Sequence, residues 1–173
     1  MAKMKADSPF DTFLSALDGE TARLYTELAD YLAMYGYNPH KLGANITFKH
    51  KQHNKQLAKM GLRTGKNGGV FFALRFSACR GYSKRFSDIV DAYMEKYPHK
   101  SACCVGKGCT CCGGAPLTHV YLHSTDDDKA HCGAYTVEIP SLTAEDVPAL
   151  KRMIAEEHAY LYTHEVNRTP MEG

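Results

Sequence analysis

The residues with the clearest chemical potential in this 173-residue chain are its cysteines, because six of the seven lie between positions 103 and 132. Thiolate sulfur is a favoured ligand of zinc and other soft metals. Several glycines lie among these cysteines, and they allow the tight turns that bring sulfurs together. The cluster therefore predicts a bound thiophilic metal. The six residues are Cys103, Cys104, Cys109, Cys111, Cys112 and Cys132.

The spacing within the cluster predicts a structural zinc site, since such sites use four tetrahedral ligands. Cys109 and Cys112 form a Cys-x-x-Cys pair, and Cys104 can reach the same ion across a glycine-containing turn. Cys132 follows on a predicted hairpin and can complete the set. The predicted zinc ligands are therefore Cys104, Cys109, Cys112 and Cys132.

Other uses of the same sulfurs stay open at this stage. The vicinal pairs Cys103-Cys104 and Cys111-Cys112 suit an iron–sulfur cluster or the capture of a metalloid, and redox disulfide chemistry is another reading. Which member of each pair binds the metal is not decided by the spacing. Cys79 stands apart from the cluster and is expected to be a small buried hydrophobe.

The charge distribution is strongly asymmetric although the net charge is only +2. Residues 31–87 contain eleven lysines and arginines and no aspartate or glutamate. A positive face of this kind attracts a phosphorylated ligand, a carboxylate or nucleic acid. The alternative is a set of solvated lysines neutralised by acidic helices beside them.

The predicted anion-binding residues flank two predicted strands, 45–50 and 70–77. If these strands pair, four cations lie around one groove that suits a phosphate or carboxylate. The four are Lys49, Lys51, Arg75 and Arg80.

Several classes of function are not favoured. The chain has no phosphate-binding P-loop, no His-Glu-x-x-His and no Gly-x-Ser-x-Gly motif, so we do not favour catalysis. Glu156-Glu157-His158 is expected to be a solvated helix face. No apolar run approaches the roughly 18 residues of a membrane span. This absence, together with an odd number of cysteines, favours a cytoplasmic protein with reduced thiols.

The periodicity of the chain predicts one α+β domain over residues 1–173, with the cysteine-rich segment 103–132 inside it. We expect an antiparallel sheet of about four strands with helices packed on one face. Residues 117–123 and 133–139 are expected to form a hairpin. The predicted helices cover 8–19, 20–35, 52–60, 82–97 and the region from 143 onward, and the remaining predicted strands cover 45–50 and 70–77.

Three segments carry a resemblance to known proteins: Phe13-Leu-x-x-Leu17, Ile46-Thr-Phe48 and Phe72-Ala-Leu-Arg-Phe76. They resemble the small bacterial α+β proteins of the frataxin-like and YdhG-like groups. The cysteine loop, with Cys132-Gly-Ala-Tyr135, is similar to insertions in zinc-bearing relatives. The resemblance covers about residues 10–97, implies the fold class and transfers no functional residue.

Together these observations predict a zinc-binding protein whose basic surface receives an anionic small molecule or a protein partner. One alternative is a thiol-based redox or metalloid-binding protein. Another is a nucleic-acid-binding accessory protein, although no recognition motif accompanies the basic residues.

Overall fold

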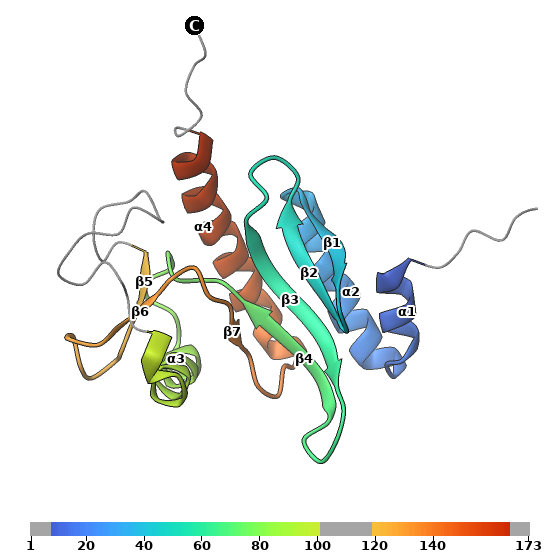
Figure 1. The fold of residues 1–173 in the computed structure, drawn as a ribbon, viewed down its shortest axis with the longest axis horizontal. Helices are drawn as coiled ribbons and strands as arrows, with labels where there is room; N and C mark the ends of the chain where they lie inside the picture. The colour runs from blue at the N-terminus through green and yellow to red at the C-terminus, as the bar shows by residue number, and fades with distance from the viewer. Residues whose placement is uncertain (1–7, 101–118, 167–173) are drawn as a thin grey trace, which may run out of the picture.

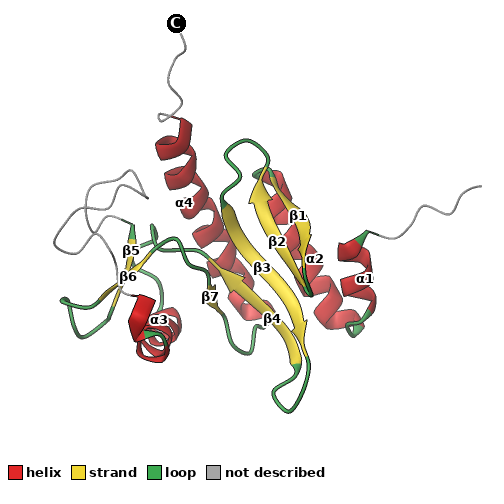
Figure 2. Ribbon diagram, viewed as in Figure 1, coloured by secondary structure: helices red, strands yellow, loops and turns green. Residues whose placement is uncertain are grey.

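A computed structural model describes residues 8–100 and 119–166, and it contains a five-stranded antiparallel sheet of order β1-β2-β3-β4-β7 (Figures 1 and 2). A separate two-stranded sheet pairs β5 with β6. The predicted α+β class is confirmed, with five strands in the main sheet in place of about four. The strands are β1 (Tyr37–Leu42), β2 (Asn45–His50), β3 (Gln56–Arg63), β4 (Gly69–Leu74), β5 (Val120–Leu122), β6 (Ala130–Cys132) and β7 (Val137–Glu138).

Four α-helices accompany the sheets in the described residues, and none of these helices is long and apolar enough to cross a membrane. Two short 3-10 turns precede the cysteine segment and the last helix. The helices are α1 (Pro9–Ser15), α2 (Gly19–Met34), α3 (Lys84–Lys96) and α4 (Val147–Val166), and the 3-10 turns are η1 (Pro98–Lys100) and η2 (Ala144–Asp146).

Helix α2 shows how local sequence fixes an element. The Asp18 side chain accepts hydrogen bonds from the first amides of the helix, and Leu28 and Leu32 lie one turn apart on its buried face. Gly36 follows the helix with a φ of +85°, a left-handed conformation that glycine adopts readily and that ends the helix.

The two faces of the main sheet have different coverings. Phe72 of β4 packs edge-on against Tyr25 of α2, and α4 contacts both α2 and β3, so these helices cover one face (Figure 1). Side chains alternate along a strand, so Phe71 and Ala73 point to the opposite face. That face borders α3. The prediction that all helices pack on one face is therefore wrong for α3.

The segment predicted as a helix over 52–60 is instead a turn followed by the first half of β3. Its residues Gln56 to Met60 have good intrinsic helix propensity, but β2 and β4 pair with it on both sides. Sheet pairing and burial of Leu57 and Ala58 override that propensity. Strand β1 was not predicted because it is an edge strand, mostly exposed, with Pro39 inside it.

The predicted hairpin of 117–123 with 133–139 is also wrong. Strand β5 pairs with β6, whereas β7 pairs with β4 and becomes an edge of the main sheet. Burial explains the separation, because Val137 and Ile139 belong to the main hydrophobic core. The second strand of the hairpin is therefore β6, and β7, which lies within the alternating stretch 133–139, joins the main sheet instead.

Candidate anion-binding groove

A groove of about 670 Å³ lies between α3 and the face of the sheet opposite α2 and α4. Lys59, Phe71 and Ala73 line its sheet side, and these residues share one face by strand alternation and by the register of β3 with β4. Helix α3 supplies the other wall. We call this hollow the α3 groove. Its volume is in the range of small-molecule binding sites.

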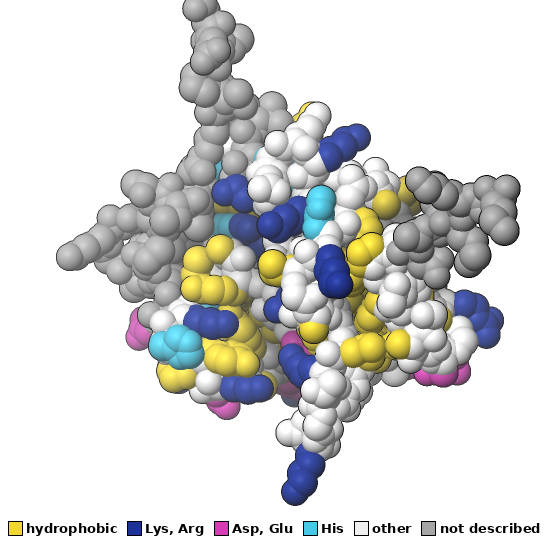
Figure 3. Space-filling view, turned by 45° about the vertical axis from the view of Figure 1, so that its right-hand side comes forward, with side chains coloured by type: hydrophobic (Ala, Val, Ile, Leu, Met, Phe, Trp, Pro, Cys, Tyr) yellow, Lys and Arg dark blue, Asp and Glu magenta, His cyan; other side chains and the backbone are white. Residues whose placement is uncertain are grey.

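Cationic side chains predominate in the lining of the α3 groove. Five cations and two carboxylates, Asp88 and Glu138, line it, which gives a formal charge of +5 − 2 = +3. On the face drawn in Figure 3, lysine and arginine side chains lie among hydrophobic ones and few acidic groups are seen. The five cations are Lys59, Arg63, Arg85, Lys96 and Lys100.

Two of these cations have acidic partners. Arg63 Nη1 donates to Glu138 Oε1 at 2.7 Å, and this carboxylate raises the pKa of Arg63. Arg85 Nε donates to Asp146 Oδ1 at 2.8 Å. Lys59, Lys96 and Lys100 form no ion pair with any residue that the structure describes. The groove thus holds three unneutralised ammonium groups.

Aromatic rings line the groove beside these lysines. The guanidinium of Arg63 lies 4.6 Å from the centroid of the Phe71 ring. Lys100 Nζ lies 4.5 Å from the Tyr97 centroid, and Lys96 Nζ lies 5.3 Å from it. Cation–π attraction holds these positive groups close to the rings without neutralising their charge.

Tyr93 contributes a second polar feature to the same wall. Its side chain is buried, and its hydroxyl has no hydrogen-bond partner among the described residues. Burial raises the pKa of this phenol. A buried hydroxyl without a partner is costly to the fold.

The four predicted anion-binding residues do not share one surface. Strand β3 lies between β2 and β4, so the condition for the predicted groove, direct pairing of these two strands, is not met. Lys49 is half-buried on β2, and Lys51 is exposed in the following turn. Arg75 is buried, and Arg80 Nη1 donates to the carbonyl oxygens of Ser77 and Cys79 at 2.6 and 2.8 Å.

Arg75 belongs to a buried polar network centred on Glu157 of α4. Glu157 Oε1 accepts hydrogen bonds from Arg75 Nε at 3.0 Å and His119 Nε2 at 2.6 Å. Its Oε2 accepts from the amide of Ala78 at 2.7 Å. Glu157 is 0% exposed, so the expectation that it lies on a solvated helix face is wrong. The network joins β4, α4 and the chain before β5.

Three histidines form another cluster near the start of β1. The rings of His50 and His53 stack with centroids 4.0 Å apart, and His158 lies 5.7 Å from His50. His158 Nδ1 is 3.2 Å from the Tyr37 hydroxyl. Burial lowers the pKa of both His50 and His158. Burial therefore favours the neutral form of His50 and His158.

Most of the predicted zinc site lies outside the described residues, which omit Cys104, Cys109 and Cys112. Cys132 is described: it ends β6, is half-buried and is not in a disulfide. Within residues 8–100 and 119–166, no group of three or more His, Cys, Asp or Glu side chains is arranged to hold a metal. Cys79 is buried, as predicted.

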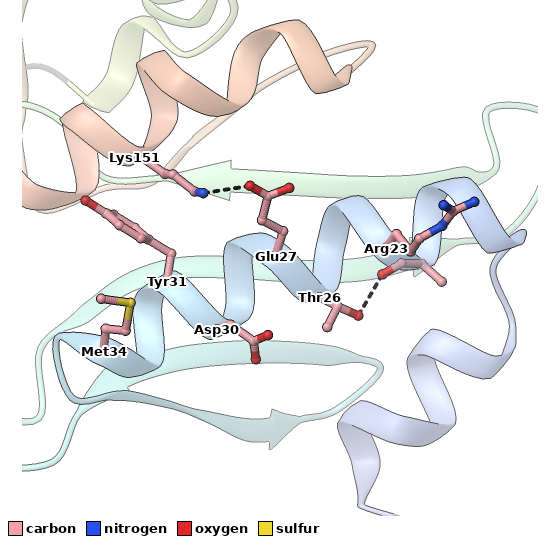
Figure 4. Close-up of a pocket in the computed structure, with 8 residues that line it drawn as sticks. Arg23, Thr26, Glu27, Asp30, Tyr31, Met34 and Lys151 are labelled. Carbon is pink, nitrogen blue, oxygen red and sulfur yellow. Dashed lines mark hydrogen bonds and ion pairs between the residues drawn. The ribbon is translucent and has the colours of Figure 1, made fainter.

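A second hollow lies over α2 on the other side of the molecule, and it provides a contrast (Figure 4). Its charged lining is balanced, with Arg23 and Lys151 against Glu27 and Asp30. Lys151 Nζ donates to Glu27 Oε1 at 2.6 Å. This hollow therefore lacks the excess positive charge of the α3 groove.

Sequence reasoning missed the residues of the α3 groove. Lys59 and Arg63 fall in the basic block, but the predicted helix over 52–60 hid their strand alternation. Lys96 and Lys100 lie outside the block, and the acidic residues around α3 obscured them. The sequence feature that could have identified this side of the groove is the alternation that places Lys59, Gly61 and Arg63 on one face of a strand.

Comparison with known proteins adds no assignment: no family model, no curated protein and no solved structure matches this chain. The resemblance to the frataxin-like and YdhG-like groups stays a prediction.

Proposed function

We propose that this protein binds an anionic ligand in the α3 groove. The observation that carries the proposal is that Lys59, Lys96 and Lys100 line one cavity and form no ion pair with any described residue. The positive charge predicted from the sequence is thus assigned to a different set of residues.

Electrostatics supports ligand binding over a purely structural role for these lysines. Like charges gathered in one hollow repel one another and contribute no folding energy of their own. An incoming anion is attracted by all three ammonium groups at once, and the low-dielectric walls of the groove strengthen this attraction. The balanced hollow over α2 offers no comparable gain.

Isothermal titration calorimetry with inorganic pyrophosphate tests the proposal, since this probe carries charge without a ring. We expect saturable binding that weakens with added salt, because the groove is open to solvent. Lys59→Gln combined with Lys96→Gln should lower the affinity at least about tenfold, the equivalent of about 1.4 kcal/mol.

The matched control is Lys129→Gln combined with Lys151→Gln. Both lysines are partly exposed and pair with acids outside the groove, Asp126 and Glu27. The control removes the same charge and should leave the affinity within about twofold. Equal losses in the two double variants would mean diffuse surface charge and would overturn the proposal.

We also propose that Cys104, Cys109, Cys112 and Cys132 bind a structural zinc ion. The position of Cys132 supports this: it pairs with Val120, two residues after the segment 101–118. His131 beside it has Nε2 2.8 Å from the carbonyl oxygen of Tyr97, four residues before that segment. Described residues shortly before and shortly after this segment therefore lie close to the proposed fourth ligand.

Metal analysis of protein purified without chelator or added metal tests the zinc proposal. We expect about one zinc per chain with reduced thiols. Cys132→Ser should weaken zinc retention against a chelator, whereas Cys79→Ala should not, because Cys79 is buried in the core. Disulfides in place of metal would favour the alternative of thiol redox chemistry.

A further inference from the structure

We infer that the ligand of the α3 groove is a nucleotide, a planar ring joined to a phosphate. This inference rests on the proposed anion-binding function and narrows its ligand class. It follows from the combination, in one cavity, of a partly accessible aromatic ring and of lysines that form no ion pair with any described residue.

The aromatic component comes from Tyr97, which lines the groove and is half-buried. In the free protein, Lys96 and Lys100 lie near its ring. A cation–π contact of this kind is worth about 0.5–1 kcal/mol at exposed sites, whereas a base stacked on an aromatic ring contributes about 1–3 kcal/mol. A base can therefore displace an ammonium group from the ring.

The displaced ammonium then becomes available to the phosphate. A phosphate monoester carries a charge of about −1.5 to −2 at neutral pH, which is more than one carboxylate supplies. The formal charge of +3 on the groove lining suits this larger charge. A simple carboxylate would leave more of the lysine charge unneutralised.

The Tyr93 ring lies beside Tyr97 in the same groove wall, with the two ring centroids 5.4 Å apart. It extends the aromatic surface against which a base would pack, which a bare phosphate would not use.

Three probes separate the ring from the anion: AMP, ribose 5-phosphate and adenosine. Calorimetry on the full chain should show AMP binding at least about tenfold more tightly than either fragment. Equal affinities for AMP and ribose 5-phosphate would overturn the nucleotide inference and leave the anion-binding function standing. If neither phosphate monoester binds while pyrophosphate does, the nucleotide inference fails and the anion-binding function stands; if pyrophosphate does not bind either, both proposals fail.

Two variants localise the ring-binding component. Tyr97→Leu keeps an apolar side chain and should lower AMP affinity at least about fivefold while pyrophosphate affinity changes less than about twofold. Tyr162→Leu, at an exposed tyrosine of α4, is the matched control and should change neither. Unchanged AMP affinity in Tyr97→Leu would contradict the inference.

A hexamer of uridylate distinguishes the source of the nucleotide. Much tighter binding than UMP, with a steep loss on adding salt, would assign the groove to single-stranded nucleic acid. Similar affinities would assign it to a free nucleotide. Either result supports recognition of a ring with a phosphate.

Discussion

The Glu157 network and the α3 groove both contain basic side chains, but their surroundings differ. In the network, Arg75 is buried against a carboxylate that also accepts from a histidine and a backbone amide. In the groove, Lys59, Lys96 and Lys100 meet aromatic rings and no acid among the described residues.

Arg75 carries a charge that is paired within the fold, whereas we propose that the three groove lysines bind a ligand. A buried charge is tolerated only when it is paired and hydrogen-bonded, so its removal damages the fold. An unpaired charge in an open cavity costs little, so its removal should damage binding alone. The predictions below test this separation in order of decreasing effect on stability.

Glu157→Ala should cause the largest loss, because it leaves Arg75 buried without its partner. Breaking a buried ion pair in this way costs about 3–5 kcal/mol of unfolding free energy. Urea denaturation followed by circular dichroism measures the change.

The neighbouring variant Glu156→Ala is the control. Glu156 is half-buried, and its pairing with Arg152 at 3.2 Å is a helix-surface contact worth at most about 1 kcal/mol. Similar losses at the two positions would show that the buried network has no special role in stability.

Gly133→Ala should have the next largest effect, because the added Cβ would lie 2.2 Å from the His119 carbonyl oxygen and 2.3 Å from Ser77 Oγ. Both atoms lie beside the Glu157 network, and overpacking of this kind costs about 1–3 kcal/mol. Thermal unfolding should show a lower melting temperature. Gly19→Ala, where no atom lies within 4 Å of the new Cβ, should leave it nearly unchanged or raise it.

The histidine cluster should make stability depend on pH. Burial lowers the folded-state pKa of His50 and His158 below the ordinary value of 6.5, and the charge of His50 adds to the effect on His158. The unfolded chain therefore binds more protons near pH 6, so this contribution is complete above pH 6.5 and is lost as the pH falls through the lowered values.

Urea denaturation at pH 7.5 and at pH 5.5 measures this dependence. His50→Gln combined with His158→Gln should reduce the difference between the two values, while His99→Gln, at an exposed histidine, should not. An unchanged difference in the double variant would exclude these histidines as its source.

The groove variant Lys59→Gln combined with Lys96→Gln should have the smallest effect on folding. Each exposed-cavity substitution should change the unfolding free energy by less than about 0.5 kcal/mol. Its melting temperature should match the wild type within a few degrees while pyrophosphate binding falls. A large loss of stability would mean that these lysines stabilise the fold, as Arg75 does.

Much of the fold was predictable where local pattern and tertiary environment agree. The apolar spacing of α2 and its glycine stop, and the alternation of β2, lead directly to the observed elements. Prediction was wrong over β3, because helix-forming residues there are held in a strand by neighbours on both sides. Burial of Glu157 was equally unpredictable, since its partners lie 38 to 82 positions away.

The site was predictable only as an excess of positive charge. The basic block includes Lys59, Arg63 and Arg85, but it gives no reason to add Lys96 and Lys100. Those two join the groove because α3 packs beside β7 and the open sheet face. Arg75 was predicted to bind an anion because it lies in a predicted strand beside other cations. Its burial removes it from the surface.

The most direct test of the central claim is a titration of the isotope-labelled protein with pyrophosphate, followed by amide chemical shifts. We predict saturable shifts at Lys59, Phe71, Lys96 and Tyr97, and none at Arg75 or around the hollow over α2. Shifts spread evenly over exposed lysines, or no shifts at the groove, would contradict the account.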